Sequence, residues 1–515
     1  MRALLSVANR DGIDELARDL AALGVETYAT EETRVALAEA GIQVAPVSAL
    51  SGSPQIPGGQ VETFHPQVFA GILARRQVDE EVRILAESGI GLIDIVVVNV
   101  KPFAPQVGSR AVPLDEAIEL IDAGGTALIT AAARNYAAVA AVSNPRHYER
   151  LVDELREQGG VSAEFRQRLA ADALADVAAY FAEVAAYLNH IAGARFPARL
   201  AVVVEKVRDL AYGENPQQDA AFYRETTHSS GTLADAVQLQ GDLPTFNDLL
   251  DLDSAYRVAM DFTAPTCCIV KQGNPTGLAS NERLADAYEK ALEGDPVSAY
   301  GAVVAVNREV DANTAAAIAG NAYEAVVAPV FSAAAREILA EKQHLALLAV
   351  PEGSAEGLSD YGIARFDFHR VDGGLLVEVR DKSEVDRSQL KVVTQRRPTL
   401  EELTDLLFAW RAVRHVTSNA VVLAHNRALV GVGAGQASRL TAVEIALHKA
   451  ADRAPLSVLA SDAYFPFADA IQLAAERGVT AIIQPGGSVR DQMAIEVADR
   501  HHMAMVFTGR RHYRH

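Results

Sequence analysis

The first third of the chain alternates short apolar runs with stretches in which apolar residues recur every three or four positions. Apolar runs over 3–8 and 93–100 are typical of buried strands, and the pattern over 12–24 predicts an amphipathic helix that ends at a glycine. A strand over 25–30 and a helix over 31–41 continue the alternation. Strands that alternate with helices predict a doubly wound α/β domain with a parallel sheet.

Ligands of doubly wound sheets bind beyond the carboxyl ends of the strands. We therefore expect ligand-binding side chains in the loops that follow Val7, Tyr28 and Val100. The Ala-rich stretch over 163–190 predicts a long helix that closes this part of the chain. We place a domain boundary near residue 195. The predicted domains are 1–195 and 196–515.

The rest of the chain also has α/β character, with more glycine-rich loops and no repeat of fixed period. The apolar run at 268–270 delivers Lys271 to a turn that contains Asn274, Pro275 and Gly277. A strand that ends in this way aims an ammonium group at a ligand. Lys271 is therefore a candidate catalytic residue.

The segment GVGAGQASR (431–439) lies between a predicted strand and a predicted helix. Its glycines are spaced GxGxG, which differs from the GxGxxG dinucleotide fingerprint, so an ordinary glycine turn explains the spacing equally well. Gln436, Ser438 and Arg439 stand at the entrance of the predicted helix, where backbone N–H groups favour anions. Contact with a ligand is therefore a second interpretation.

Three further segments carry candidate chemistry. QPGGSVRD (484–491) exposes backbone N–H groups and, with TSNA (417–420) and the loop above, predicts a shared polar pocket. The basic C-terminus RRHYRH (510–515) is either a solvated tail or an arginine clamp for phosphate or carboxylate. Asp122 precedes paired glycines and a helix, so it is part of a plain turn, a general base or an anchor for an amide.

Composition narrows these alternatives. The chain has 515 residues, half of them apolar, and a net charge of −20, which argues against a nucleic-acid surface and leaves room for a local basic pocket. The adjacent Cys267 and Cys268 provide no metal-site spacing and make a poor bridge, which fits a reducing compartment. The N-terminal apolar run is too short for a signal peptide, and no stretch approaches the ~20 apolar residues of a membrane span. We expect a soluble cytoplasmic protein.

Taken together, these stretches resemble one family, the bifunctional purine enzyme AICAR transformylase/IMP cyclohydrolase, over nearly the whole chain. The motifs in the second part are YGENP, QLQG, VK–NP–G, DPVSAYG, NREVD, SNA, GAGQASR, SDAYFPF, IIQPGGSVRD and MVFTGRRHYRH. Those in the first part are HP followed by GILARR, IDIVVVN, PF and GGTALITAAARN. The resemblance implies a methylglyoxal-synthase-like doubly wound domain followed by a cytidine-deaminase-like α/β transformylase unit.

The resemblance also implies the chemistry. The larger domain of the family moves a formyl group from 10-formyltetrahydrofolate to the 5-amino group of AICAR, and the smaller one closes formylated AICAR to IMP with loss of water. Its members are intertwined homodimers with the transformylase site at the subunit interface. The resemblance implies that no metal does the chemistry, although a structural potassium ion is associated with the family. The expected partners are AICAR, formylated AICAR, IMP and reduced folate, with neither nucleic acid nor membrane.

Residues at the functional positions of the family's motifs take their expected roles from the resemblance, whether or not the residue type is kept. The catalytic candidates are Lys271, Gln272, Asn419, His515, Asp122, Lys101 and Arg134. The substrate-binding candidates are Tyr212, Asn274, Asp295, Ser298, Gly301, Gln436, Ser438, Arg439 and Arg511 in the second domain, and Ser6, Arg10, Thr30 and Thr33 in the first. The candidates for binding the reduced folate are Phe465, Pro466, Gln484, Gly486 and Gly487.

The transformylase part departs from the family's pattern at several positions. Gln272 stands where the family typically has a histidine that helps take the proton from the arylamine, and a neutral amide cannot accept that proton near pH 7. Lys271 remains to stabilise the oxyanion or protonate the folate leaving nitrogen. Ala211 replaces an arginine and Gln217 a histidine beside the substrate phosphate, for which Arg511 remains a candidate clamp.

The cyclohydrolase part departs further. ATEET (29–33) replaces the family's Ser-Thr-Gly-Gly-Thr phosphate loop, so Glu31 and Glu32 place negative charge where a phosphate lies. ANRDG (8–12) replaces Ser-Asp-Lys-Thr-Gly, and Glu62 replaces a lysine. Two further replacements are Lys101 for tyrosine and Arg134 for lysine, whereas Asp122 is kept. Ring closure is intramolecular and needs mainly positioning and oxyanion stabilisation.

We expect formyl transfer and IMP formation from this sequence. The departures leave two alternatives. A non-catalytic nucleotide or folate binder predicts saturable binding without turnover. An enzyme with a changed, non-phosphorylated substrate predicts tighter binding of the nucleoside than of the nucleotide.

Overall fold

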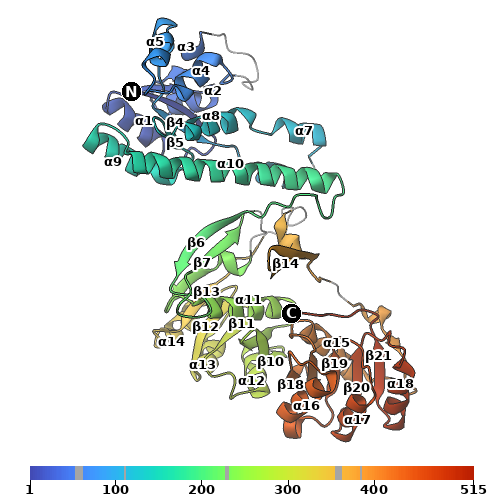
Figure 1. Cartoon of the computed structure of the whole chain (residues 1–515). Coiled ribbons are helices and arrows are strands. Elements are labelled where there is room, and N and C mark those ends of the chain that lie inside the picture. The colour runs from blue at the N-terminus through green and yellow to red at the C-terminus, as the bar shows by residue number, and fades with distance from the viewer. Residues whose placement is uncertain (53–61, 109–111, 227–230, 354–361, 383–384) are drawn as a thin grey trace. The chain divides into compact units, whose positions relative to one another are not determined.

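The chain forms two compact units in the computed structural model (Figure 1). Among the described residues, unit 1 comprises 1–203 with the short segments 225–226 and 362–365, and unit 2 comprises the rest of the chain from Val204 to His515. The predicted domains 1–195 and 196–515 stay a prediction, because compactness alone does not define an independently folding domain. The structure describes residues 1–52, 62–108, 112–226, 231–353, 362–382 and 385–515.

Unit 1 contains a five-stranded sheet in the order β3-β2-β1-β4-β5. Every neighbouring pair in this sheet is parallel, which confirms the expected doubly wound arrangement. The strands are β1 (Arg2–Val7), β2 (Glu26–Ala29), β3 (Ala45–Pro46), β4 (Ile95–Asn99) and β5 (Ala140–Val142).

Helices cover both faces of this sheet because successive side chains of a strand point to opposite sides. Leu5 packs with Leu16 of α1 and Leu151 of α9 on one face, while Leu4 packs with Leu128 of α8 on the other. The helices expected over 12–24, 31–41 and 163–190 are confirmed as α1, α2 and α10. The helices of unit 1 are α1 (Ile13–Ala22), α2 (Glu31–Glu39), α3 (Ser48–Ser51), α4 (Pro66–Leu73), α5 (Asp79–Glu87), α6 (Ala104–Gly108), α7 (Leu114–Glu119), α8 (Ala123–Arg134), η1 (Pro145–His147), α9 (Tyr148–Gln158) and α10 (Ala163–Ile191).

Unit 2 is built on a twelve-stranded mixed sheet in the order β16-β21-β20-β19-β17-β18-β10-β9-β11-β12-β13-β8. Its strands are β8 (Val237–Gln240), β9 (Thr266–Lys271), β10 (Asn274–Ser280), β11 (Ala302–Val306), β12 (Tyr323–Ala328), β13 (Ala346–Ala349), β16 (Lys391–Val392), β17 (Val421–His425), β18 (Ala428–Gly433), β19 (Val458–Ser461), β20 (Ala481–Gln484) and β21 (Ala504–Phe507). Two ribbons of two strands lie outside it, β6 (Val204–Leu210) with β7 (Ala220–Glu225) and β14 (Phe366–Val371) with β15 (Gly374–Val379).

This large sheet consists of two halves with the same strand order. From the outer edges inward, one half runs 8, 13, 12, 11, 9, 10 and the other 16, 21, 20, 19, 17, 18. In Figure 1 the first half is green to yellow and the second orange to red. The halves meet where β10 and β18 pair antiparallel at Ala279 and Ala428.

The helices repeat as well. α11 and α15 pack through Leu252 and Leu406 on one continuous core, whereas α12–α14 and α16–α18 cover the opposite face of their own halves. Cys267 and Cys268 are buried and free, one in each facial core. The short helix η4 (Ile363–Arg365) belongs to unit 1. The helices of unit 2 are η2 (Leu233–Asp235), α11 (Phe246–Met260), α12 (Leu284–Gly294), α13 (Ala312–Ala319), α14 (Ala333–Leu339), η5 (Arg387–Gln389), α15 (Leu400–Val413), α16 (Arg439–Ala450), η6 (Ala451–Arg453), α17 (Asp469–Glu476) and α18 (Asp491–Arg500).

The sequence has no repeat of fixed period, and this duplication of one strand order was not predicted from it. A structural repeat preserves apolar periodicity and turn chemistry, which many different residues satisfy. A local signal was present: PTFNDLLD (244–251) and PTLEELTD (398–405) both place a threonine, an acidic residue and an aspartate at the same spacing. Thr245 and Thr399 form capping boxes with the acidic residues three positions later, which begin α11 and α15.

None of the helices in the described part of the chain combines the length and apolar character that a bilayer crossing requires.

Candidate active site

The turn between β9 and β10 places Lys271 and Gln272 at the tip of a hairpin. Lys271 pairs with Asn274, which leaves Gln272 and Gly273 as a two-residue turn with φ angles of 52° and 75°. Positive φ at both central residues defines a type I′ turn, which suits the twist of a hairpin. The expected delivery of Lys271 to a turn by a strand is confirmed. Gln272 is exposed and holds a left-handed conformation that is uncommon outside glycine.

A carboxylate from α11 fixes this turn. Asp251 accepts hydrogen bonds from the backbone N–H of Gln272 at 2.9 Å and of Gly273 at 2.6 Å. Burial raises the pKa of Asp251, although the two N–H donors act in the opposite direction. The Ser254 hydroxyl, one turn further along α11, donates to the carbonyl of Gly273 at 3.3 Å. The tip of the hairpin is thus anchored to α11 through both its donors and an acceptor.

Lys271 lies against the loop that precedes β11. Its ammonium group donates to the carbonyl oxygen of Tyr300. A Cβ added to Gly301 would lie 3.5 Å from the Lys271 nitrogen. Because Gly301 has a φ of 63° and no side chain, the loop approaches the lysine closely.

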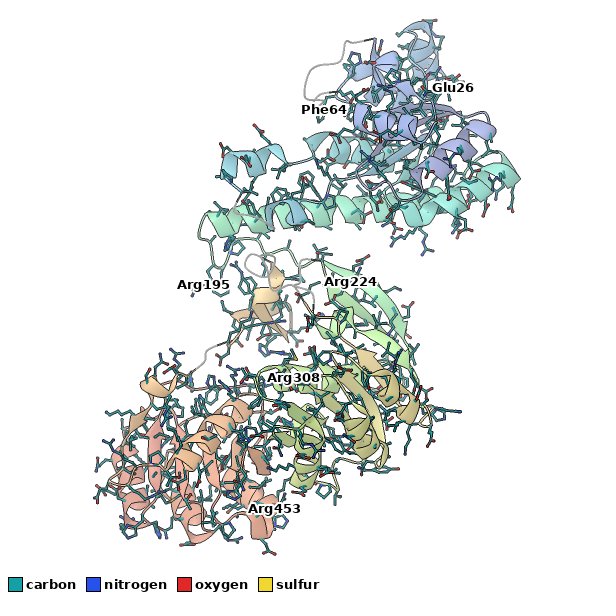
Figure 2. The ribbon with its side chains drawn as sticks, turned by 180° about the vertical axis from the view of Figure 1, so that it is seen from behind. Glu26, Phe64, Arg195, Arg224, Arg308 and Arg453 are labelled. Atoms are coloured by element: carbon teal, nitrogen blue, oxygen red, sulfur yellow. The ribbon has the colours of Figure 1, made fainter. Side chains whose placement is uncertain are left out.

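The same loop carries Asp295 and Ser298, whose side chains shape it. Asp295 accepts the backbone N–H of Ser298 at 3.0 Å and its hydroxyl at 2.8 Å. Lys449 of α16 donates to Asp295 at 3.0 Å, and Arg453 (Figure 2) donates to the carbonyl of Gly294 at 3.0 Å. Burial opposes ionisation of Asp295, but the bonds from Ser298 and Lys449 hold its pKa below the ordinary value. Basic residues of the second half therefore fasten a loop of the first.

The polar residues of the second half meet the hairpin where the two halves join. Asn274 accepts the backbone N–H of Thr417 at 2.9 Å. The Asn419 side chain donates to the carbonyl of Gln436 at 2.7 Å and accepts from Arg439 at 2.6 Å. The structure thus brings Asn274, Asn419, Gln436 and Arg439 into one network.

Within this network Arg439 has an internal role. It is 7% exposed, and its guanidinium pairs with the fully buried Asp462 and donates to Ser461 at 3.0 Å. The same guanidinium also donates to the carbonyl of Ala420 at 3.2 Å, and its other terminal nitrogen holds Asn419. Ser438 caps α16 by accepting the N–H of Thr441 at 3.5 Å. Both residues therefore shape the GAGQASR loop, and Arg439 orients the amide of Asn419.

The C-terminal tail lies beside the same loop, because the N–H of Ser418 donates to the carbonyl of Arg514 at 2.8 Å. Arg511 and His515 are exposed and flank Tyr513. The Arg511 guanidinium lies 4.7 Å from the centroid of the Tyr513 ring, and the centroid of the His515 ring lies 6.0 Å from it. Tyr212 is half-buried, and among the described residues its side chain makes no hydrogen bond. The tail thus adds a basic, solvent-facing edge to the network.

The residues expected to bind folate gather at the ends of β19 and β20. The backbone N–H of Phe465 donates to the Gln484 side chain at 3.2 Å, and that side chain donates to the Met505 sulfur at 3.3 Å. Phe465 and Gln484 are fully buried, so they support this edge from within. A Cβ on Gly486 would lie 2.4 Å from the Phe507 ring, so glycine is required there for the loop to close.

The exposed surface at this edge combines the expected Gly487 with two residues that the sequence reasoning missed, Phe467 and Val489. Phe467 is 57% exposed and lies under the Arg490 guanidinium, 4.6 Å from the ring centroid. Val489 is fully exposed, and Gly487 faces open space. The available signal was the second phenylalanine of SDAYFPF, two residues beyond Phe465.

In unit 1, three of the expected residues meet at the ends of β1 and β2. The Thr30 hydroxyl donates to that of Ser6 at 3.2 Å, and the Thr33 hydroxyl accepts the N–H of Val7 at 2.9 Å. Arg10 is exposed in the loop after β1. These positions agree with the rule that ligands lie beyond the carboxyl ends of parallel strands.

Carboxylates lie at the start of α2, where an anionic ligand would otherwise be favoured. Glu31 forms a two-bond ion pair with Arg34, at 2.6 and 2.8 Å. Its backbone N–H donates to Glu62 at 3.2 Å. Glu62 therefore adds a negative charge to those of Glu31 and Glu32 at the N-terminus of this helix.

Asp122 and Arg134 lie at opposite ends of α8. Asp122 caps the helix by accepting the N–H of Gly125 at 2.7 Å, and it also accepts that of Lys101 at 3.4 Å. At 1.5 Å per residue, Arg134 lies roughly 18 Å further along the helix axis. It borders a cavity of about 390 Å³ that is lined mainly by apolar side chains, including Phe69 and Phe181. The structure thus joins Lys101 to Asp122 and leaves Arg134 apart.

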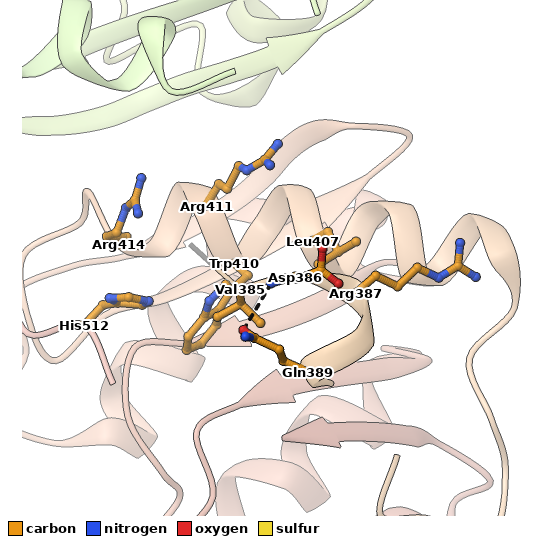
Figure 3. A pocket seen from close by; sticks show the side chains of 9 residues that line it. All are labelled: Val385, Asp386, Arg387, Gln389, Leu407, Trp410, Arg411, Arg414 and His512. Carbon is orange, nitrogen blue, oxygen red and sulfur yellow. Dashed lines mark hydrogen bonds between the residues drawn. The ribbon is translucent and has the colours of Figure 1, made fainter. Parts of the chain in front are cut away.

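A separate cavity of about 300 Å³ lies along α15 (Figure 3). His512 stacks against Trp410 in its wall, with ring centroids 4.9 Å apart. Arg414, also in the wall, pairs with Asp261. None of the candidate site residues named above lines this cavity, whose lining residues are Val385, Asp386, Arg387, Gln389, Leu407, Trp410, Arg411, Arg414 and His512.

The fold and these two sets of loops define a protein of two α/β units, each with polar side chains at the ends of its strands. A sequence model of the MGS-like domain matches residues 12–127, and one of the AICARFT/IMPCHase bienzyme matches residues 132–449. The chain belongs to the AICARFT/IMPCHase bienzyme family. The resemblance inferred from the motifs and the order of its two α/β parts are confirmed.

Relatives match this chain over its whole length. The bifunctional purine biosynthesis protein PurH of Desulfitobacterium hafniense is 45% identical over 522 residues, which cover 100% of this chain and 99% of the relative. The PurH proteins of Halalkalibacterium halodurans and Acetivibrio thermocellus are 43% and 42% identical, with the same coverage. The crystal structure of ForH is 37% identical and covers 36% of this chain and 96% of its own, with a TM-score of 0.32.

Proposed function

We propose that this chain transfers the formyl group of 10-formyltetrahydrofolate to the 5-amino group of AICAR in unit 2, and closes the formylated product to IMP in unit 1. The observation that carries the proposal is the identity of 42–45% with bifunctional purine biosynthesis proteins over the full length of the chain. The network that joins the Lys271 hairpin to the Asn419 loop supports the assignment of formyl transfer to unit 2.

Lys271 has the chemistry that formyl transfer needs. The amine nitrogen of AICAR attacks the formyl carbon, a C–N bond forms, and the carbonyl oxygen takes up negative charge. The bond from that carbon to the folate nitrogen then breaks, and the nitrogen takes a proton. An ammonium group has three donors, and one of those of Lys271 is bound to Tyr300. The others remain to stabilise the oxyanion or protonate the leaving nitrogen.

Gln272 and His515 have different proposed roles at the amine of AICAR, orientation for Gln272 and proton acceptance for His515. The Gln272 amide accepts a hydrogen bond from the amine and orients it, but it does not take the proton. His415 and His512 are engaged with Asp261 at 3.0 Å and Asp381 at 2.5 Å. His515 is exposed on the tail and has no ion pair among the described residues. We assign the proton acceptor to His515, because an imidazole accepts protons near pH 7.

The co-substrate supplies an activated formyl carbon, and the exposed edge of Phe467, Val489 and Gly487 would hold its planar part. Exposed apolar side chains at Val297 (85%) and Tyr300 (73%), beside the carbonyl that binds Lys271, support assembly into a homodimer. Among the described residues no group of three or more His, Cys, Asp or Glu could hold a metal ion, and no step above involves potassium. We place the reaction in the cytoplasm, with AICAR, formylated AICAR, IMP and reduced folate as ligands.

The test is to incubate the purified protein with AICAR and 10-formyltetrahydrofolate and to separate tetrahydrofolate, formylated AICAR and IMP by chromatography. We expect all three to appear in sequence. Accumulation of formylated AICAR without IMP would remove ring closure from unit 1. Binding of AICAR without any product would overturn the proposal in favour of a non-catalytic binder, and tighter binding of the nucleoside than of AICAR would indicate a changed substrate.

A further inference from the structure

The Gln272–Gly273 turn is held by two sets of contacts. Comparison with the second half of the sheet shows which of them is common to both hairpins and which occurs only in the first. One is the Asp251 carboxylate described above. In the second half, Asp405 of α15 accepts the backbone N–H of Asn426 at 2.8 Å and of Arg427 at 2.7 Å. The aspartate contact therefore occurs in both halves and belongs to the architecture of the hairpin.

The second set comes from Arg514 in the C-terminal tail. Its guanidinium donates to the carbonyl of Gly273 at 3.4 Å, to the Ser254 hydroxyl at 3.2 Å and to the carbonyl of His415. Its backbone exchanges two hydrogen bonds with Ser418, at 2.8 Å and 3.3 Å. Arg514 thus joins the hairpin turn, α11, the end of α15 and the loop that presents Asn419.

This arginine contact has no counterpart in the second half. The carbonyl of Arg427, which corresponds to that of Gly273, accepts the backbone N–H of Ser280 at 2.9 Å. Within the described ranges, no guanidinium donates to the Asn426–Arg427 turn. The contact that distinguishes the two turns is therefore the one that ties the first turn to the tail carrying His515.

The physical character of Arg514 suits this role. Burial lowers the pKa of Arg514, and its donors meet two carbonyls and a hydroxyl, with no carboxylate partner among the described residues. A planar guanidinium fixes several acceptors at once, which a lysine on a flexible stem cannot do. Because His515 follows Arg514 directly in the chain, the contacts that hold Arg514 also restrict the position of His515.

We propose that Arg514 is a positioning residue for formyl transfer, which fixes the Lys271–Gln272 turn and the His515 tail relative to each other. The inference rests on the proposed function of unit 2. It assigns no contact with substrate to Arg514, whose guanidinium makes its three recorded hydrogen bonds to the protein.

The test compares R514Q and R514K with R308Q as a matched control. Arg308 (Figure 2) also donates to backbone carbonyls of unit 2, those of Asn307 at 2.7 Å and of Thr263. We expect R514Q to lower kcat for formyl transfer by about 10²-fold, because a displacement of about 1 Å at a reacting group has this effect. KM for AICAR should change little, R514K should recover part of the loss, and R308Q should lower the melting temperature without lowering kcat.

Hydrogen exchange of the Gln272 and Gly273 amides provides a readout independent of turnover. R514Q should speed exchange at both amides in the folded protein, and R308Q should not. Wild-type exchange in R514Q, or a kcat equal to that of R308Q, would overturn the positioning role. If the wild-type protein shows no formyl transfer, the proposed function fails, and the exchange comparison alone decides whether Arg514 holds the turn.

Discussion

The two halves of the large sheet in unit 2 share an architecture but differ at the tips of their central hairpins. Each half begins a helix with a threonine capping box, and each uses an aspartate of that helix to hold a type I′ turn. The first tip is Lys-Gln-Gly-Asn (271–274) and the second is His-Asn-Arg-Ala (425–428). The shared aspartate and turn type are therefore features of the fold. The residues that differ between the two tips are candidates for a role in catalysis.

The halves contribute different parts to one site. The first supplies the hairpin tip and the loop that contacts Lys271. The second supplies the Asn419 loop and the GAGQASR loop, and the tail follows its last strand. Because β10 and β18 pair directly, Asn274 and Thr417 meet across the join. A duplicated fold can therefore keep one half for each part of a reaction centre.

The largest expected effect is the loss of Lys271. K271M should lower kcat for formyl transfer by about 10²–10³-fold, as expected when one preorganised donor to an oxyanion is removed. H425M changes the corresponding position of the second hairpin and should leave kcat unchanged. Steady-state kinetics of both variants would decide the matter. An equal loss in the two variants would show that the hairpins are not functionally distinct.

The next effect concerns the shared aspartates. D251N and D405N should each lower the free energy of unfolding by roughly 1–3 kcal/mol, because an amide leaves one of the two buried N–H donors unpaired. Only D251N should also lower kcat, since its turn carries Lys271 and Gln272. Urea denaturation and kinetics on the same preparations provide the comparison, and a kcat loss in D405N would contradict it.

The pH dependence of the unfolding free energy of D251N extends the comparison of Asp251 with Asp405. Burial raises the pKa of Asp251, so the folded protein holds this proton more tightly than the unfolded chain does. The stability that Asp251 contributes through this shift is present below about pH 4 and is lost as pH rises through the folded pKa. The difference in unfolding free energy between wild type and D251N should therefore decrease across that range. A difference that grows with pH would mean that the N–H bonds outweigh burial.

Substitution of Gln272 by histidine tests the mechanism through an expected increase in kcat. Q272H should raise kcat by about tenfold, less than the 10²–10⁴-fold that general bases contribute, because the proposed mechanism already assigns proton acceptance to His515. The gain should appear as the imidazole loses its proton near pH 6–7. Histidine tolerates the left-handed backbone of this position. N426H is the control in the second hairpin, and a Q272H enzyme no faster than wild type would remove proton transfer at this tip from the mechanism.

The sequence predicted the doubly wound unit and the Lys271 turn because both depend on local periodicity and turn residues. It did not predict that Arg439 is taken up by Asp462, or that Phe465 and Gln484 are internal supports. These outcomes depend on partners far along the chain, which a local pattern does not contain. The duplication was not predicted because a shared strand order depends on apolar periodicity and turn chemistry, which many different residues satisfy.

The smallest expected effect is the change in stability when the second residue of each turn is substituted. Arg427 has a φ of 57°, which costs a residue with a Cβ about 1–2 kcal/mol, and R427G should recover about 0.5 kcal/mol after the added freedom of the unfolded chain is subtracted. G273A should destabilise the first hairpin, although a Cβ there meets nothing within 4 Å, because φ is 75°. Urea midpoints that shift in opposite directions would show that both turns obey the same backbone requirement. Shifts of the same sign would mean that the Arg427 side chain stabilises its turn.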